Sequence, residues 1–132
     1  MTSKINYGET PEFQKDFKKL LKKFKSLEDD FELAKVAAIE LFHIQKVNNL
    51  STFPVQGLCT EKIQICKIKK FACKALKGRG SKSGIRVIYA FHCENYKVDF
   101  IEIYFKGEKA NEDRERIKAY LKDFSSSLNN VR

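Results

Sequence analysis

Three cationic side chains and one phenol occur in the sequence at spacings that suit the handling of a phosphate group. Lys67 and Lys69 alternate within one apolar run, Arg86 lies inside a second run, and Tyr104 lies near the end of a third. A guanidinium is costly to desolvate among apolar neighbours unless an anion meets it. If the three runs are adjacent strands whose cationic faces coincide, the four side chains line one concavity that fits a phosphate.

The net charge of the chain comes from the same region. The 132 residues include 26 Lys and Arg against 17 Asp and Glu, a net charge of +9. All nine excess cations lie between positions 62 and 93, which hold no acid, whereas the other hundred residues carry 17 charges of each sign. A local excess of this kind attracts polyanions, so we expect a nucleic-acid partner. The alternative is a half-exposed sheet whose solvent face happens to be cationic.

The first half of the chain has the period of helices. An apolar stretch at residues 5–7 predicts a short edge strand. Thr10-Pro11 then provides an N-cap and a first helical residue, and apolar residues recur at helical spacing over 13–24. We interpret the lysines between them as a solvated face. A second amphipathic helix reaches about residue 47, and the turn formers of 48–57 predict a loop.

The second half has the composition of strands and ends in a helix. The expected elements are three strands at 63–71, 84–92 and 97–105, a loop at 74–83, a hairpin turn at 94–96 and a helix at 111–124. We therefore predict an α+β fold in the order β-α-α-β-β-β-α. Two N-terminal helices pack on a curved antiparallel sheet, a C-terminal helix follows, and residues 1–132 form one domain, which is long enough to bury a core.

Side chains alternate between the two faces of a strand, which divides residues 84–92 into two groups. The odd-numbered residues should pack on the helices: Ile85, Val87, Tyr89 and Phe91. The even-numbered residues then face an uncovered side, from which Arg86 projects. His92 shares this parity, but six residues of strand place it about 20 Å away at roughly 3.3 Å each. One phosphate cannot contact both, and we expect His43, in the second helix, to be a packed side chain.

The sequence also argues against membrane, metal and cofactor sites. No apolar run has the length of a signal peptide or a membrane span, so we expect a cytoplasmic protein without a membrane partner. The four cysteines show no C-x-x-C spacing and the chain has only two histidines. We therefore expect reduced structural thiols, no metal and no cofactor.

The strand Ser83-Gly84-Ile85-Arg86-Val87-Ile88-Tyr89 carries a family resemblance. With Lys67-Ile68-Lys69 before it and a hairpin to 98–104 after it, this strand resembles the RelE/ParE superfamily of toxins from type II toxin-antitoxin modules, with the RelE/HigB-like branch favoured. The motif resemblance covers about residues 66–117. It implies a hydrolase: a metal-independent mRNA endoribonuclease, associated with the ribosome, that inhibits translation. The implied partners are mRNA, the ribosome and a cognate antitoxin protein.

The resemblance also suggests roles for individual residues. Arg86 matches the family's phosphate-stabilising arginine by motif position. Lys67 and Lys69 match the family's lysine pair, one of which serves as base or charge stabiliser. Ribonuclease members often place an Arg just after the last strand and a Tyr or His near the C terminus. Here that stretch is Lys106-Gly107-Glu108-Lys109 and no His follows, so Tyr104 is the preferred participant and the general acid and base stay open.

The other late polar residues have more ordinary interpretations. We read Tyr120 as the edge of the last helix's apolar stripe. Arg114 and Arg116 fit a charge-balanced helix start.

The remaining cations of the basic region are expected to hold flanking RNA. They are Lys70, Lys74, Lys77, Arg79 and Lys82, and we expect the same of Lys106 and Lys109, which follow the last strand. Two other functions stay open: a ParE-like poison of DNA gyrase, and a non-catalytic RNA-binding module that uses the basic loop. The lysine pair, Arg86 and the acid-free segment favour RNA.

Overall fold

A short edge strand and a capped helix begin the fold. The computed structural model describes residues 4–48, 50–76, 78 and 82–130. Strand β1 (Asn6–Glu9) is followed by helix α1 (Pro11–Lys23). The Thr10 side chain accepts a hydrogen bond from the backbone N–H of Phe13 at 3.2 Å, which satisfies one of the free donors of the first turn. The predicted helix start is therefore confirmed.

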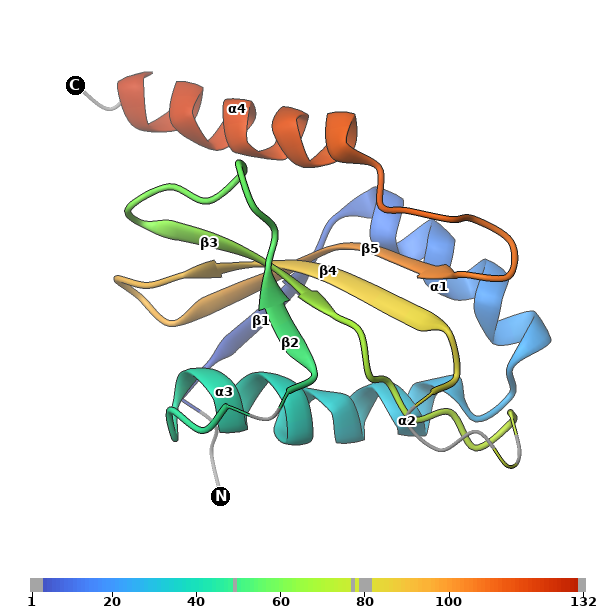
Figure 1. Cartoon of the computed structure of the whole chain (residues 1–132). Coiled ribbons are helices and arrows are strands. Elements are labelled where there is room, and N and C mark those ends of the chain that lie inside the picture. The colour runs from blue at the N-terminus through green and yellow to red at the C-terminus, as the bar shows by residue number, and fades with distance from the viewer. Residues whose placement is uncertain (1–3, 49, 77, 79–81, 131–132) are drawn as a thin grey trace.

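The second helical segment changes its winding in the middle. It consists of α2 (Leu27–Ala34), a π-helical segment (Lys35–Glu40) and α3 (Leu41–His43), which follow one another without a break. Figure 1 shows them as one long rod below the sheet. The broad apolar surface of this segment predicted a helix but did not indicate its wider π-helical turns.

A mixed sheet of five strands forms the centre of the molecule. Its other strands are β2 (Thr52–Pro54), β3 (Ile63–Ile68), β4 (Ile85–His92) and β5 (Lys97–Phe105), and the spatial order is β1-β5-β4-β3-β2. Neighbouring strands from β2 to β5 are antiparallel, whereas β1 pairs with β5 in parallel. The sheet is thus antiparallel as predicted except at this edge.

Strand β2 corrects the prediction of a loop at 48–57. Its residues pair with β3, with Pro54 opposite Cys66 at the edge of the sheet. An edge position tolerates proline because one side of the strand needs no ladder hydrogen bond. A three-residue strand that ends in proline carries almost no pattern, which explains why the turn formers around it dominated the prediction.

Helices cover both faces of the sheet, although one face was predicted to be open (Figure 1). The odd-numbered residues of β4 pack with α1 and α2 in the main core, as predicted. On the other face, Ile88, Ala90 and His92 are buried under helix α4 (Arg114–Asn130), which packs there through Ile117. The prediction of an uncovered face was therefore wrong for these three residues and holds only near Arg86, which is half-buried.

Helix α4 begins three residues later than predicted. The Asp113 side chain accepts a hydrogen bond from the backbone N–H of Arg116 at 3.1 Å, the geometry of an N-cap. Residues 106–113 consequently form a loop that crosses the end of the sheet before the helix starts. This loop brings the Glu112 side chain to Lys67 of the predicted phosphate site.

Candidate functional site

The four predicted site residues lie at one end of the α4 face: three are on adjacent strands, and Lys69 comes directly after β3. Arg86 on β4 pairs with Tyr104 on β5. Lys67 on β3 pairs with Ile88, the next residue of β4 that shares a face with Arg86. The Nη1 atom of Arg86 donates a hydrogen bond to the carbonyl oxygen of Lys69 at 2.7 Å, which places Lys69 beside Arg86. We call the residues Lys67, Lys69, Arg86 and Tyr104 the open end of the sheet. Lys69 is exposed and Arg86 is half-buried there, whereas Tyr104 is buried at its border with the core under α4.

Arg86 keeps most of its donors available. Its Nη1 atom contacts the carbonyl oxygens of Lys69 at 2.7 Å and Ile85 at 3.4 Å. Among the described residues, no carboxylate forms an ion pair with it. A guanidinium has five N–H donors in a planar fork, so Nη2 and Nε remain for two parallel hydrogen bonds to an anion. The observed tether fixes the side chain without neutralising it.

Lys67 has an acidic partner that sequence reasoning missed. Its Nζ lies 2.7 Å from Glu112 Oε1, and the two side chains are only 16% and 13% exposed. Burial opposes this pair, yet the hydrogen bond and charge of Lys67 lower the pKa of Glu112, and the same bond raises the pKa of Lys67. Both groups therefore stay charged at neutral pH. Glu112 stands 45 residues from Lys67 in the crossing loop, so no local pattern links them.

Tyr104 lies beside this pair and contacts both of its members. Its hydroxyl donates to Glu112 Oε1 at 3.4 Å, and the Nζ of Lys67 lies 5.8 Å from the ring centroid. Burial raises the pKa of Tyr104, although the nearby Lys67 works against that rise. The phenol therefore stays protonated at neutral pH and can act as a hydrogen-bond donor.

A second buried carboxylate, Glu102, lies one row away on β5. It is 1% exposed, pairs with Lys109, and accepts a hydrogen bond from the backbone N–H of Asp113 at 2.8 Å. The Nζ of Lys109 also lies 5.7 Å from the ring of Tyr104. Lys109, predicted to hold RNA, is thus paired with an acid. The shared parity of Glu102 and Tyr104 was a usable sequence signal for this contact.

The other predicted RNA-binding cations divide between two surfaces. At the open end, the exposed Lys106 follows β5, and its N–H donates to the carbonyl oxygen of Gly84 at 2.8 Å. Lys69, which was predicted as a catalytic residue, lies there with its Nζ 4.9 Å from the ring of Phe53. Lys82 is exposed just before β4. Lys70 and Lys74 instead line a separate hollow beside α2. Lys77 and Arg79 lie outside the described residues.

The far end of the same face is closed by a polar network under α4. The Tyr120 hydroxyl donates to Asp99 Oδ2 at 2.6 Å and lies 2.6 Å from His92 Nε2. Because the single hydroxyl proton points to Asp99, Nε2 of His92 must carry a proton and donate to Tyr120. Burial lowers the pKa of His92, with Asp99 opposing it. Tyr120 thus belongs to the apolar stripe, as predicted, and also anchors the helix through its hydroxyl.

His43 is a packed histidine, as predicted. Its Nε2 lies 2.8 Å from the Tyr89 hydroxyl, and its ring stacks on Phe91 with centroids 3.9 Å apart. Burial, with a smaller effect from Lys46, lowers its pKa to about 4. Neither histidine is near Arg86 in the strand register, so neither belongs to the open end.

The arginines at the start of α4 connect it to the rest of the molecule. Arg116 pairs with Asp16 of α1 at 2.6 Å and donates to the carbonyl oxygen of Ile101 at 3.0 Å. Arg114 donates to the carbonyl oxygen of Gln56 at 3.1 Å. Their interpretation as a charge-balanced helix start was incomplete, because these partners lie outside the helix.

The described part of the chain contains neither a metal-binding cluster nor a membrane-spanning helix. There, no three His, Cys, Asp or Glu side chains gather as a metal-binding group. The four cysteines are free thiols, and burial raises the pKa of Cys66 to about 12. No helix among the described residues combines the length and apolar character needed to cross a membrane.

The chain is similar in fold to a solved structure, at low sequence identity. No family model matches the chain, and no curated protein matches it. A chain of the archaeal RelE–RelB complex from Pyrococcus horikoshii OT3 is similar with a TM-score of 0.49 and 12% sequence identity, over 80% of this chain and 98% of that chain. At this identity and TM-score, the likeness does not assign the chain to a family.

Proposed function

We propose that this protein is the toxin of a type II toxin-antitoxin module and acts as a metal-independent mRNA endoribonuclease at the ribosome. In this proposal the open end of the sheet holds the scissile phosphate, and a cognate antitoxin prevents RNA from reaching it. The observation that carries the proposal is the placement of Arg86 opposite Tyr104 and beside Lys69, which follows β3, with the Arg86 fork unpaired by any described carboxylate. The resemblance of the Arg86 strand to the toxin motif supports the same function.

The proposed chemistry needs three actions at one phosphate. A base removes the proton of the ribose 2′-OH, cations stabilise the crowded phosphate, and an acid protonates the departing 5′-oxygen. We assign the phosphate to Arg86 and Lys69, which among the described residues lack carboxylate partners. The charged pair of Lys67 and Glu112, with the Tyr104 phenol beside it, offers a carboxylate base and a proton donor within one cluster.

A non-catalytic RNA-binding module is the second candidate. The ion pair of Lys67 with Glu112 favours it, since a lysine held at 2.7 Å by a carboxylate is a weaker phosphate ligand than a free one. The exposed lysines around the open end would then bind RNA through charge alone. This candidate predicts affinity for RNA that falls with salt, without cleavage.

One experiment separates these functions. The wild-type protein and Arg86→Ala would be expressed in bacteria with mapping of mRNA 5′ ends, and the purified proteins assayed on RNA with EDTA present and in a gyrase supercoiling assay. We expect Arg86→Ala to reduce cleavage about 100-fold or more, the loss typical of removing one stabilising donor. Lys62→Ala is the matched control, because Lys62 is an exposed cation of the same acid-free segment that pairs with Glu94.

Three outcomes would contradict the proposal. Intact transcripts with inhibited supercoiling would indicate a gyrase poison. RNA binding by the wild-type protein without cleavage, both of purified RNA and of mRNA in the bacteria, would indicate the binding module. Equal loss of cleavage in Lys62→Ala and Arg86→Ala would mean that net charge, rather than a phosphate site, governs the activity.

A further inference from the structure

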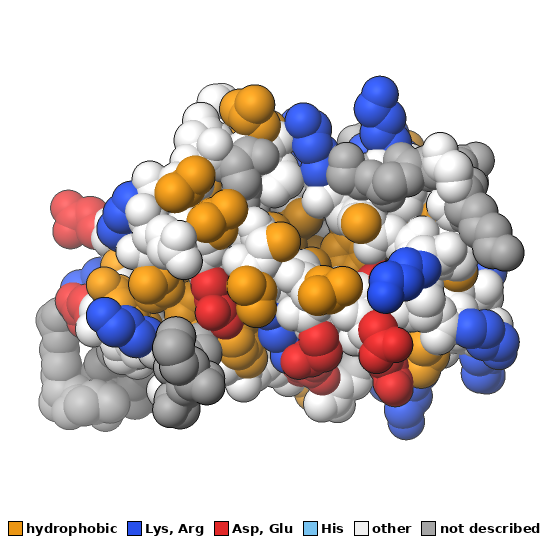
Figure 2. Space-filling model, turned by 90° about the horizontal axis from the view of Figure 1, so that it is seen from below, with side chains coloured by type: hydrophobic (Ala, Val, Ile, Leu, Met, Phe, Trp, Pro, Cys, Tyr) orange, Lys and Arg blue, Asp and Glu red, His pale blue; other side chains and the backbone are white. Residues whose placement is uncertain are grey.

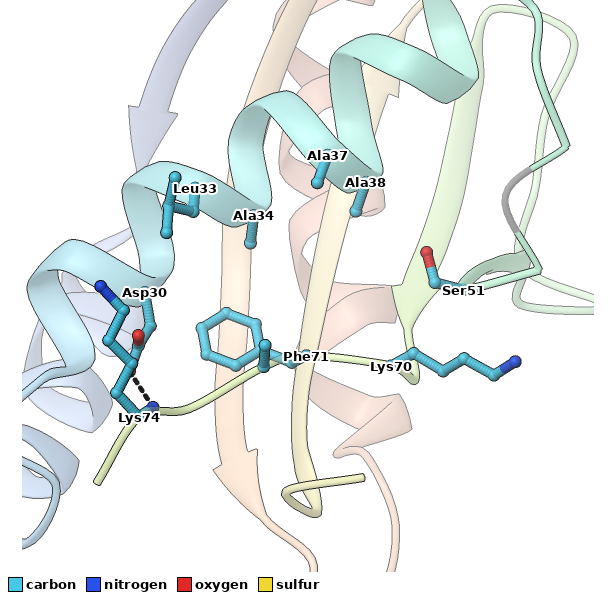
Figure 3. A pocket seen from close by; sticks show the side chains of 10 residues that line it. Asp30, Leu33, Ala34, Ala37, Ala38, Ser51, Lys70, Phe71 and Lys74 are labelled. Carbon is cyan, nitrogen blue, oxygen red and sulfur yellow. Dashed lines mark hydrogen bonds between the residues drawn. The ribbon is translucent and has the colours of Figure 1, made fainter. Parts of the chain in front are cut away.

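A hollow of about 350 Å³ lies on the opposite side of the sheet from the open end. Figure 3 shows it between the rod formed by α2 and the π-helical segment and the chain that follows β3. The buried side chains of Ala34, Ala38 and Phe71 line its floor, and Leu33 lies on its rim. The wall is thus built from a helix on one side and an extended segment on the other.

The surface around this hollow is unusually apolar for the outside of a helix. Leu33 and Val36 are each 59% exposed, although the solvent side of a surface helix normally carries polar residues. Figure 2, which views this side of the molecule, shows apolar side chains gathered over the face and a recess among them. Contiguous exposed apolar side chains mark interaction surfaces, and π-helical turns such as Lys35–Glu40 are frequent at functional sites.

Among the residues that line the hollow, the charged groups left without a partner are both cationic. Asp30 is already used inside the molecule, because its Oδ2 accepts from Ser26 Oγ at 2.6 Å and from the backbone N–H of Lys74 at 3.1 Å. The ammonium groups of Lys70 and Lys74, by contrast, pair with no carboxylate among the described residues, and Figure 3 shows their side chains at the two sides of the hollow. The lining of the hollow therefore combines an apolar floor with two lysines that have no acidic partner among the described residues.

We propose that this hollow docks an acidic amphipathic peptide segment of a partner protein. Apolar side chains of the segment fill the floor over Ala34, Ala38 and Phe71, and its carboxylates meet Lys70 and Lys74. A second copy of this chain does not fit, since its net charge of +9 would repel the two lysines. An anionic membrane matches the charges, but a recess suits inserted side chains better than a flat surface does.

The test uses two synthetic helical peptides with the same Leu face. One carries Glu on its polar face and the other carries Lys, so that only the sign of the charge differs. Binding is measured by fluorescence anisotropy, with backbone amide chemical shifts to locate the contact. We expect the acidic peptide alone to bind and to shift the amides of Ala34, Ala38 and Phe71.

Two substitutions locate the binding further. Leu33→Glu, on the rim of the hollow, should weaken binding of the acidic peptide at least tenfold. Val47→Glu, an exposed apolar residue that does not line the hollow, is the control with the same change of charge and should leave binding unchanged. Both variants should bind RNA like the wild-type protein. Failure of the proposed nuclease is therefore distinguishable from failure of this docking site.

Several results would overturn the proposal. They are equal binding of the two peptides, equal loss in Leu33→Glu and Val47→Glu, or amide shifts that lie outside the hollow. Concentration-dependent dimers that Leu33→Glu abolishes would assign the face to a second copy. Loss in Leu33→Glu of binding to vesicles of anionic phospholipid, without peptide binding, would assign it to a membrane.

Discussion

The two ends of the sheet face under α4 use the same three strands in opposite ways. At one end, the closed end, the side chains Ile63, Ile65, Ile88, Ala90, His92 and Ile101 are buried against α4. Its polar groups satisfy one another, as in the chain from His92 through Tyr120 to Asp99. At the open end, Lys69 and Arg86 have no carboxylate partner among the described residues. One face thus changes from a core to a cationic surface within a few residues.

The path of a single loop separates the two ends. Residues 106–113 cross the sheet before α4 begins at Arg114, so the helix reaches only the far half of the face. The loop brings Lys109 to Glu102 of β5 and Glu112 to Lys67 of β3. It brings no acid to Arg86. Exposure of a strand residue therefore depends on what crosses the strand as much as on its parity.

Truncation at the closed end should have the largest effect on stability. Ile88→Ala removes a fully buried side chain under α4, and we expect it to lower the free energy of unfolding by about 2–5 kcal/mol. Arg86, two residues away on the same face, is half-buried, so Arg86→Ala should cost only about 1 kcal/mol, the net value of a hydrogen bond. Urea denaturation of both variants measures the difference. Equal losses would show that the two ends are not distinct in packing.

The pH dependence of stability should come from the two buried histidines, neither of which lies at the open end. His43 has a pKa of about 4 in the folded protein, against about 6.5 for an unperturbed histidine. The unfolded chain therefore takes up this proton first, so stability is complete above pH 6.5 and falls as the pH drops toward 4. The linkage gives a loss of about 2 kcal/mol at pH 5. The lowered pKa of His92 acts in the same direction.

Two measurements check this pH effect. His43→Gln keeps a polar group opposite Tyr89 but does not titrate, so its stability should fall less than that of the wild-type protein between pH 7 and pH 5. RNA affinity of the folded protein should stay constant between pH 7.5 and pH 6, because no histidine lies at the open end. A wild-type stability that is flat down to pH 5 would contradict the packing described for His43.

The sequence predicted which side chains of β4 share a face, but it did not predict which of them lie under helix α4. Alternation in β4 correctly separated Val87 from Arg86, because a half-buried strand has a period of two. The course of the crossing loop leaves no such periodic signal, so the cover over Ile88 was missed. The partner of Lys67 was missed for the same reason, since Glu112 reads locally as part of a balanced helix start. Long-range ion pairs depend on chain path, which a single sequence does not encode in a local pattern.

Removing the acid at the border of the two ends should make the open end more cationic. Glu112→Gln keeps a hydrogen-bond acceptor for Lys67 and Tyr104 but removes the charge, at a cost of about 1.5 kcal/mol in stability. Lys67 then becomes available to a phosphate. The slope of log affinity for single-stranded RNA against log salt should steepen by about 0.7. Cleavage should fall in this variant if Glu112 is the base, whereas unchanged cleavage would exclude it from that role.

The smallest expected effect tests whether the open end is a site or only part of a basic surface. Lys69→Gln should weaken RNA binding less than tenfold and reduce the salt slope by about 0.7, because one phosphate contact is lost. Lys18→Gln makes the same change of charge on the exposed face of α1, which we interpret as solvated. It should leave the slope unchanged. Since both variants have the same net charge, a difference between them can come only from position. Equal reductions would assign RNA affinity to the overall charge of +9 and remove the distinction between the open end and the rest of the surface.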